Sequence, residues 1–372
     1  MGHEMSLRQQ INDKRREIKT DGYPMSIGEW VSMYEREELD IHPEFQRFYR
    51  WSDAQKAGLI ESILLGIPLP PIFVSQREDG VWDVVDGLQR LSTIFQFMGI
   101  LKDANGGLVE PLVLIGTKYL PSLEGVVWGG DDEAENDMPK ELRLIVKRSK
   151  IGASIVLKES DESAKYDLFQ RLNTGGSELS PQEVRNCLMV MINKDFYEWI
   201  RKFRENTDFK ETTALSDRPI EEAYDTELAL RFLVFGTIAV SELKSIGDIG
   251  VFLTERMTEV AAAKDFAEKP ATDLFNNTFS IINGALEDDA FKRFNSAKGR
   301  HEGGFLLSLF EVVALGVAFN LMENTLCSKN EIRKRAQSVW SDSSFTKWAT
   351  SGMTATRRLP HLIPYGRALF RA

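Results

Sequence analysis

The sequence has few residues of the types that form disulfides or hold metal ions. Its 372 residues include two cysteines and four histidines. A disulfide framework or a zinc site needs more thiols, or thiols at other spacings, than Cys187 and Cys327 provide. Both lie in apolar helical patterns, so we expect reduced side chains in or near the core of a cytoplasmic protein. The histidines are scattered and do not have the spacing of metal ligands.

Long apolar runs are missing as well. No stretch approaches the roughly 18 residues of a membrane helix, and the polar N-terminus has no hydrophobic segment of a secretory signal. No membrane partner is therefore expected. Basic residues are outnumbered by acidic ones, 46 to 56, which gives a net charge of −10. This balance argues against a large general nucleic-acid surface, although it allows a local basic cleft.

The remaining composition, 42% apolar and 27% charged, is that of a packed globular protein. Residues 1–20 predict a solvated helical extension, residues 21–190 a domain with both strands and helices, and residues 191–372 a helical domain. Strands are expected only in the first half, so the predicted class is α+β followed by a mostly helical region.

Local signals fix several elements of the first half. "MSIGEWVSMYEREEL" (25–39) predicts a short strand that runs into a helix. Residues 67–76 and 79–85 each predict a strand. Asp79-Gly80 is a good hairpin turn between the two strands. Apolar spacing predicts a helix over 88–98. Farther on, Ser180, Pro181 and Glu183 form a capping box with proline at the first helical position.

The end of the second hairpin strand is a candidate phosphate site. It reads Asp86-Gly87-Leu88-Gln89-Arg90 and presents a helix N-terminus, whose free N–H groups and dipole favour an anion. Arg90 opposes the dipole unless an anion fills the site, and its guanidinium can grip phosphate with two hydrogen bonds. Asp86 could hold Mg²⁺, orient a water molecule or only cap the helix. The stretch alone leaves a capped turn and a phosphate site equally open.

Two further segments contain the same Gln-Arg pair. Gln46-Arg47, with Arg50, lies among the aromatic residues of "PEFQRFYRWS", where arginines and rings can stack a base or simply build a loop. Gln170-Arg171 closes a helix before the loop Asn173-Thr174-Gly175-Gly176, which offers backbone and side-chain donors to a phosphate or ribose. That loop has no Walker lysine. Three arginines converging on one pocket would suit a triphosphate.

The order of these motifs carries a resemblance. "PEFQRFYRW", "IPLPPIF", "DVVDGLQRLSTI" and "FQRLNTGGSELSPQEVRN" occur in this order before a helical half. The chain thereby resembles the N-terminal domain of the GmrSD-type restriction endonuclease family, which has a D-G-Q-Q-R signature. The resemblance covers about residues 20–240 and implies a fold similar to ParB and sulfiredoxin.

The resemblance also implies binding and hydrolysis of a nucleoside triphosphate with a divalent metal, in bacterial defence against phage or foreign DNA. The signature residues Asp86, Gly87, Gln89 and Arg90 match in this chain, with Asp86 as the metal ligand. The upstream pair matches Gln46 and Arg47, and the downstream loop matches Asn173, Thr174 and Gly175.

Two positions depart from the family pattern. Leu88 stands where the family usually has glutamine, which makes hydrolysis less secure than binding. The C-terminal half has only His301 and His361, far apart, so we expect no HNH nuclease domain.

Three functions remain open. The first is Mg²⁺-dependent hydrolysis of a nucleoside triphosphate, with Asp86, Gln89 and Arg90 as catalytic residues. The second is a ParB-like nucleotide-sensing, DNA-binding switch that regulates a partner nuclease or modification-system protein. The third is a DNA nickase or endonuclease that uses the same pocket. A homodimer through the N-terminal helix or the apolar helix at 304–322 is a further option, with burial in the core as the alternative.

Overall fold

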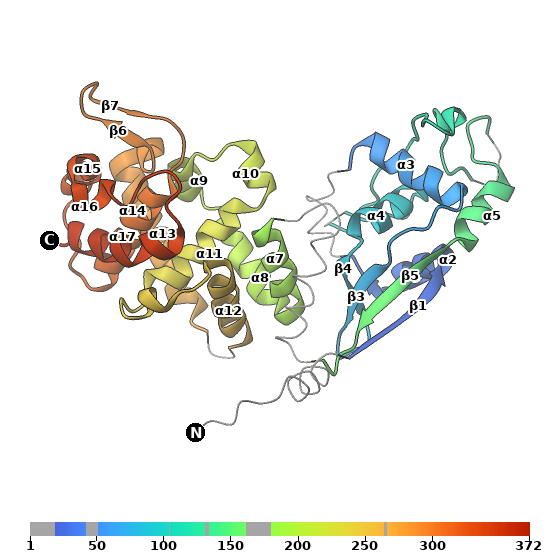
Figure 1. Ribbon diagram of the computed structural model, residues 1–372, viewed down its shortest axis with the longest axis horizontal. Helices are drawn as coiled ribbons and strands as arrows, with labels where there is room; N and C mark the ends of the chain where they lie inside the picture. Colours follow the sequence, from blue (N-terminus) through green and yellow to red (C-terminus); the bar gives the residue numbers. More distant parts are fainter. Residues whose placement is uncertain (1–18, 42–50, 104, 131–133, 161–179, 264–265) are drawn as a thin grey trace. The chain divides into compact units, whose positions relative to one another are not determined.

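The computed structural model describes residues 19–41, 51–103, 105–130, 134–160, 180–263 and 266–372 (Figure 1). Its contacts divide the chain into two compact units, residues 1–178 and 179–372. The predicted class is confirmed: the first unit contains a sheet with helices, and the second is helical. The helix expected in the N-terminal extension lies outside the described residues.

The first unit is built on a five-stranded mixed sheet with the order β1-β5-β3-β4-β2. Strand β1 pairs antiparallel with β5, and β3 pairs antiparallel with β4, whereas the β5–β3 and β4–β2 pairs are parallel. The strands are β1 (Thr20–Ser26), β2 (Leu39–Asp40), β3 (Ile72–Gln76), β4 (Trp82–Asp86) and β5 (Lys150–Val156). The β3–β4 hairpin and its turn are as predicted, with Gly80 at a φ of +90°.

Two helices of the first unit, α2 and α3, begin at a serine N-cap. Ser26 caps α2, and Ser52 forms a capping box with Gln55 at the start of α3. The strand-to-helix reading of 25–39 and the helix at 88–98 are both confirmed. The helices are α2 (Ile27–Glu35), α3 (Asp53–Leu64), α4 (Leu88–Phe97), the short η2 (Pro121–Leu123) and α5 (Lys140–Arg148). Their buried faces share one core with the sheet, around Trp30, Ile72 and Phe95.

The second unit packs its helices around phenylalanine rings. The ring centres of Phe209 and Phe232 each lie within 5.6 Å of the ring centres of both Phe275 and Phe279. Its helices are α7 (Pro181–Ile192), α8 (Lys194–Phe203), α9 (Thr207–Thr213), α10 (Asp217–Glu221), α11 (Tyr224–Gly236), α12 (Ile249–Ala262), α13 (Glu268–Leu286), α14 (Leu307–Met322), α15 (Lys329–Ser338), α16 (Ser343–Thr346) and α17 (Ala355–Leu369), with the 3₁₀ turns η4 (Glu242–Ser245), η5 (Glu287–Asp289) and η6 (Val339–Ser341). The capping box predicted at Ser180 is confirmed.

The apolar helix predicted within 304–322 is a core helix of this unit. Residues Leu309 to Ala318 of α14 are all buried. Gly316 faces Gly366 of α17 so closely that a side chain at either would overlap the other helix's backbone. Cys327 is buried, as expected. Among the described residues, no helix combines the length and the apolar character needed to span a membrane.

The prediction that strands are confined to the first half is wrong. Strands β6 (Arg293–Asn295) and β7 (Arg300–Glu302) form an antiparallel hairpin in the second unit, with Phe294 opposite His301. Each strand has three residues, which is too short for an alternating pattern to be recognised. Gly299, at a φ of +63°, allows the tight turn.

Candidate functional site

The candidate site lies where β4 passes into α4. Gly87 joins the two elements at a φ of +101° and is the N-cap of α4. A Cβ at this position would overlap the Cδ1 of Ile72, a fully buried residue of β3. Backbone angle and space therefore both require glycine here. As the N-cap, Gly87 has no side chain to accept from the first turn of α4, and a helix N-terminus of this kind favours an anion.

Arg90 is held in this turn by hydrogen bonds to its own surroundings. Its Nη2 donates to Asp86 Oδ2 at 3.0 Å, and its Nη1 donates to the carbonyl oxygens of Pro70 and, at 3.1 Å, Pro71. The side chain is only 11% exposed. Burial lowers the pKa of Arg90, and the Asp86 carboxylate partly opposes that shift. The arginine thus ties the proline segment before β3 to the β4–α4 turn and fixes the Asp86 carboxylate.

Asp86 keeps access to solvent although it is paired. Its side chain is 40% exposed. Mg²⁺ in phosphate-transfer sites is often held by one or two carboxylates together with substrate phosphates and water. A single carboxylate beside a helix N-terminus fits that arrangement, with Asp86 as the ligand. Among the residues that the structure describes, no group of three or more His, Cys, Asp and Glu side chains forms a metal cage.

The two residues between Gly87 and Arg90 have different environments. Leu88 is partly buried and packs against the core of the first unit, so the apolar residue at this position has a packing role. Gln89 is partly exposed, and its carbonyl accepts a hydrogen bond from Thr93 Oγ1 at 2.7 Å. Of the two residues, only Gln89 has a side-chain amide, which lies in the first turn of α4.

The other predicted site residues lie outside the described residues. Whether the three Gln-Arg pairs converge stays a prediction. These residues are Gln46, Arg47, Arg50, Arg171, Asn173, Thr174 and Gly175. The structure brings together Asp86, Gly87, Gln89 and Arg90. Trp51, at the end of the aromatic segment, packs against the core of the first unit.

A second ion-paired group on β4 was not predicted. Arg77 Nε donates to Asp83 at 2.9 Å, and its Nη2 donates to Asp40 at 2.7 Å. Asp83 is buried. Partial burial acts to lower the pKa of Arg77, but the hydrogen bonds that it donates to the two carboxylates raise the pKa overall. The arginine therefore joins β2 to the β3–β4 hairpin.

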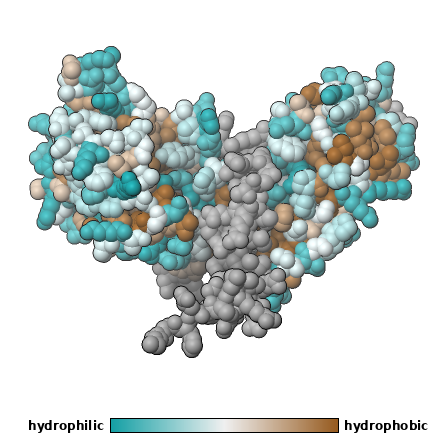
Figure 2. All heavy atoms as spheres, in the orientation of Figure 1, coloured by the Kyte–Doolittle hydropathy of each residue, from teal (hydrophilic) through white to brown (hydrophobic). Residues whose placement is uncertain are grey.

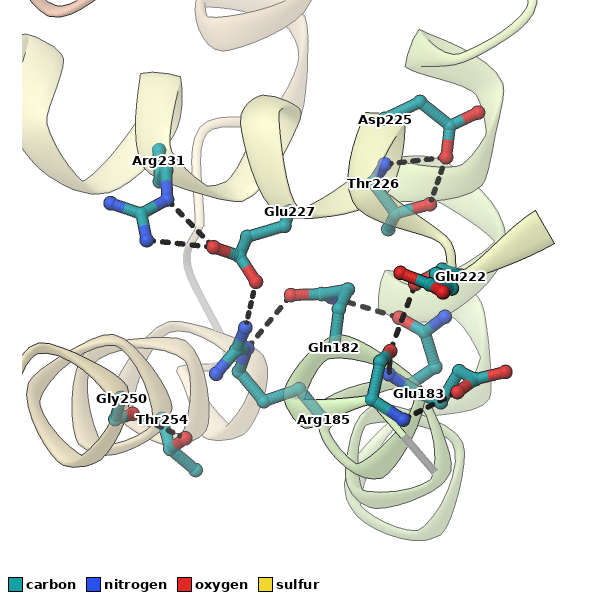
Figure 3. Close-up of polar contacts among 12 residues, drawn as sticks. Gln182, Glu183, Arg185, Glu222, Asp225, Thr226, Glu227, Arg231, Gly250 and Thr254 are labelled. Atoms are coloured by element: carbon teal, nitrogen blue, oxygen red, sulfur yellow. Dashed lines mark hydrogen bonds and ion pairs between the residues drawn. The ribbon is translucent and has the colours of Figure 1, made fainter. Parts of the chain in front are cut away.

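Helix α7 carries an unpredicted buried polar face just after its capping box. Arg185, 3% exposed, donates to Gln182 at 2.7 Å and to Glu227 of α11 at 2.6 Å. Arg231 donates to the same carboxylate at 2.7 and 2.9 Å, so Glu227 lies between two guanidinium groups (Figure 3). Gln182 in turn donates to Asn186 at 2.9 Å. The signal in the sequence is the polar run "PQEVRN" ahead of the apolar "CLMVMI".

Comparison with known proteins finds a similarity over part of the chain. Residues 27–190, less than half of it, match the family model of the GmrSD restriction endonuclease N-terminal domain. The match begins at the start of α2 and ends two residues before the end of α7. No curated protein and no solved structure matches the chain, so the likeness to ParB and sulfiredoxin stays a prediction.

Proposed function

We propose, from the premise that residues 27–190 form a GmrSD-type N-terminal domain, that this chain binds and hydrolyses a nucleoside triphosphate with Mg²⁺. The domain type suggests a role in a restriction or defence system and an interaction with DNA. One observation carries the proposal: a helix N-terminus with glycine at its N-cap lies beside a solvent-accessible carboxylate that a partly buried arginine holds in place.

Each described residue has a role in this proposal. The N–H groups of the first turn of α4 bind a phosphate, and Gly87 permits the backbone to approach it. Asp86 would hold Mg²⁺, and the metal would offset the charge of the phosphates. Arg90 orients Asp86 through their 3.0 Å hydrogen bond and adds positive charge near the phosphates. Gln89 orients the attacking water.

The proposal extends to residues on either side of this turn in the sequence. They would hold the base, ribose and outer phosphates, because arginines, amides and a glycine-rich loop are suited to those contacts. This set is Gln46, Arg47, Arg50, Arg171, Asn173, Thr174 and Gly175.

A second candidate function is a nucleotide-sensing switch that binds without turnover and regulates a partner nuclease. Two observations favour it. Arg90 gives three of its hydrogen bonds to Asp86 and the proline carbonyls, so those donors do not reach a phosphate. Leu88 packs against the core and cannot position water as an amide would.

The experiment is a screen of nucleotide binding and phosphate release over all NTPs and dNTPs, with and without Mg²⁺ and DNA. We expect Asp86→Asn to abolish Mg²⁺-dependent phosphate release while the chain stays folded. Glu78→Gln is the matched control, because it makes the same charge change at the exposed far end of the same hairpin, where the side chain is 88% exposed.

The outcomes separate the candidates. Phosphate release that Asp86→Asn abolishes and Glu78→Gln preserves supports the hydrolase. Tight Mg²⁺-dependent binding with negligible release, weakened by Asp86→Asn alone, supports the switch. Absence of binding to every nucleotide tested would refute both.

A further inference from the structure

The last part of the helical unit has a charge opposite to that of the rest of the chain. Residues 290–372 contain 13 lysines and arginines and five acidic residues, a net charge of +8. The preceding 289 residues contain 33 basic and 51 acidic residues, a net charge of −18. Such charge asymmetry is typical of chains in which one part contacts a polyanion. The overall charge of −10 conceals it.

Most of these basic side chains reach solvent. They come from the β6–β7 hairpin, from α15 and from the segments around α16 and α17. We call this set the basic end; its exposed members are Arg293, Lys298, Arg300, Lys329, Arg333, Lys334, Lys347, Arg357 and Arg371.

The acidic residues of this segment neutralise only part of the basic end. Glu302 accepts from both Lys298 and Arg300. Within the described part of the chain, no carboxylate lies within 4 Å of Lys334 or Arg357. Arg293 lies over the Trp340 ring, with its guanidinium carbon 5.3 Å from the ring centre. These cations thus remain available to an external anion.

The elements of the basic end pack together. Strand β6 contacts η6, which also contacts α15 and α16, and α16 contacts α17. The hairpin extends beyond the neighbouring helices of its unit (Figure 1). The face of the hairpin that Figure 2 shows is mainly hydrophilic. A two-stranded ribbon of this kind has the width that the major groove of DNA admits.

We propose that the basic end binds duplex DNA through the phosphate backbone. Duplex DNA presents one negative charge per about 1.7 Å of its axis, so several dispersed cations can each meet a phosphate. The acidic remainder of the chain repels the same polyanion, which directs the contact to this end. Backbone contacts fix position without reading sequence, so the basic end supplies affinity that is independent of sequence. The nucleotide site takes no part in this binding.

The test is binding of the full chain to a fluorescent 20-bp duplex over a range of NaCl concentrations, without nucleotide. The logarithm of the affinity should fall linearly with the logarithm of the salt concentration, with a slope of about −0.9 per phosphate contact. The test variant Lys334→Ala/Lys347→Ala/Arg357→Ala should reduce the steepness of that slope by about 2 to 3.

The matched control removes three exposed lysines elsewhere in the same unit. Lys210→Ala/Lys244→Ala/Lys269→Ala gives the same net charge and should leave the slope as in the original protein. All six residues are exposed, so both triple variants should fold.

Three results would overturn the proposal. They are absence of salt-dependent binding, an equal loss in the two triple variants, and competition by poly-L-glutamate or anionic vesicles as effective as that by the duplex. The last result would assign the basic end to an acidic polypeptide or a membrane surface. Because no nucleotide is present and Asp86 is unchanged, failure here would leave the proposed nucleotide site untested and intact.

Discussion

Replacement of Gly87 by alanine should destabilise the β4–α4 turn more than the same change at another glycine of the hairpin. Gly87 and Gly80 have similar backbone angles, with φ of +101° and +90°. For an alanine, such a conformation costs about 1–2 kcal/mol. Gly80 has open space around it, whereas a methyl group at Gly87 would overlap the buried Ile72 side chain. Overpacking of this kind adds about 1–3 kcal/mol.

The expected total is therefore about 2–5 kcal/mol for Gly87→Ala and about 1–2 kcal/mol for Gly80→Ala. The assay is hydrogen exchange of peptides from β3, β4 and α4 in a urea titration, which reports the opening free energy of this unit separately from the helical unit. The difference between the two variants isolates the steric part. Equal effects of the two substitutions would refute the argument that Ile72 closes the space beside Gly87.

Further predictions concern the buried network and the signature. Glu227→Ala should cost about 3–5 kcal/mol because it removes the carboxylate that the buried Arg185 and Arg231 share. Arg185→Ala should cost less, about 1–3 kcal/mol, because Glu227 keeps Arg231; urea unfolding would show the reverse order if the pairing were wrong. Burial raises the pKa of Tyr224 to about 12, so between the ordinary pKa of about 10 and this value only the unfolded chain ionises there. Stability should therefore fall as pH rises from 10 to 12, and less so in Tyr224→Phe, which matched urea midpoints would test. Leu88→Gln should raise phosphate release if the missing amide limits hydrolysis, at a cost of about 1–2 kcal/mol in stability; an unchanged rate in a folded variant would contradict that.

The sequence predicted the elements whose signals are local. A turn at Asp79-Gly80, a capping box at Ser180 and the spacing of α4 depend on neighbours within a few residues, so they could be recognised without the fold. The β6–β7 hairpin was missed because three-residue strands carry no period.

Contacts distant in the sequence could not be predicted. Arg90 was expected to be available for phosphate. Two of its acceptors, however, are the carbonyl oxygens of Pro70 and Pro71, which are 20 and 19 residues away along the chain. The same applies to Arg77, whose partner Asp40 is 37 residues away. A pattern shows which residues carry charge, but only the assembled sheet shows which of them are already satisfied.

The polar face of α7 has a consequence for how this chain can be divided. The family match ends at residue 190, yet Arg185 finds its partner Glu227 in α11, beyond that boundary. A fragment cut at the end of the match would carry an exposed helix with an arginine that has lost its carboxylate. The unit that is shared between related proteins and the unit that folds thus have different borders. Fragments for biochemical work should either end before Ser180 or retain the helical unit whole.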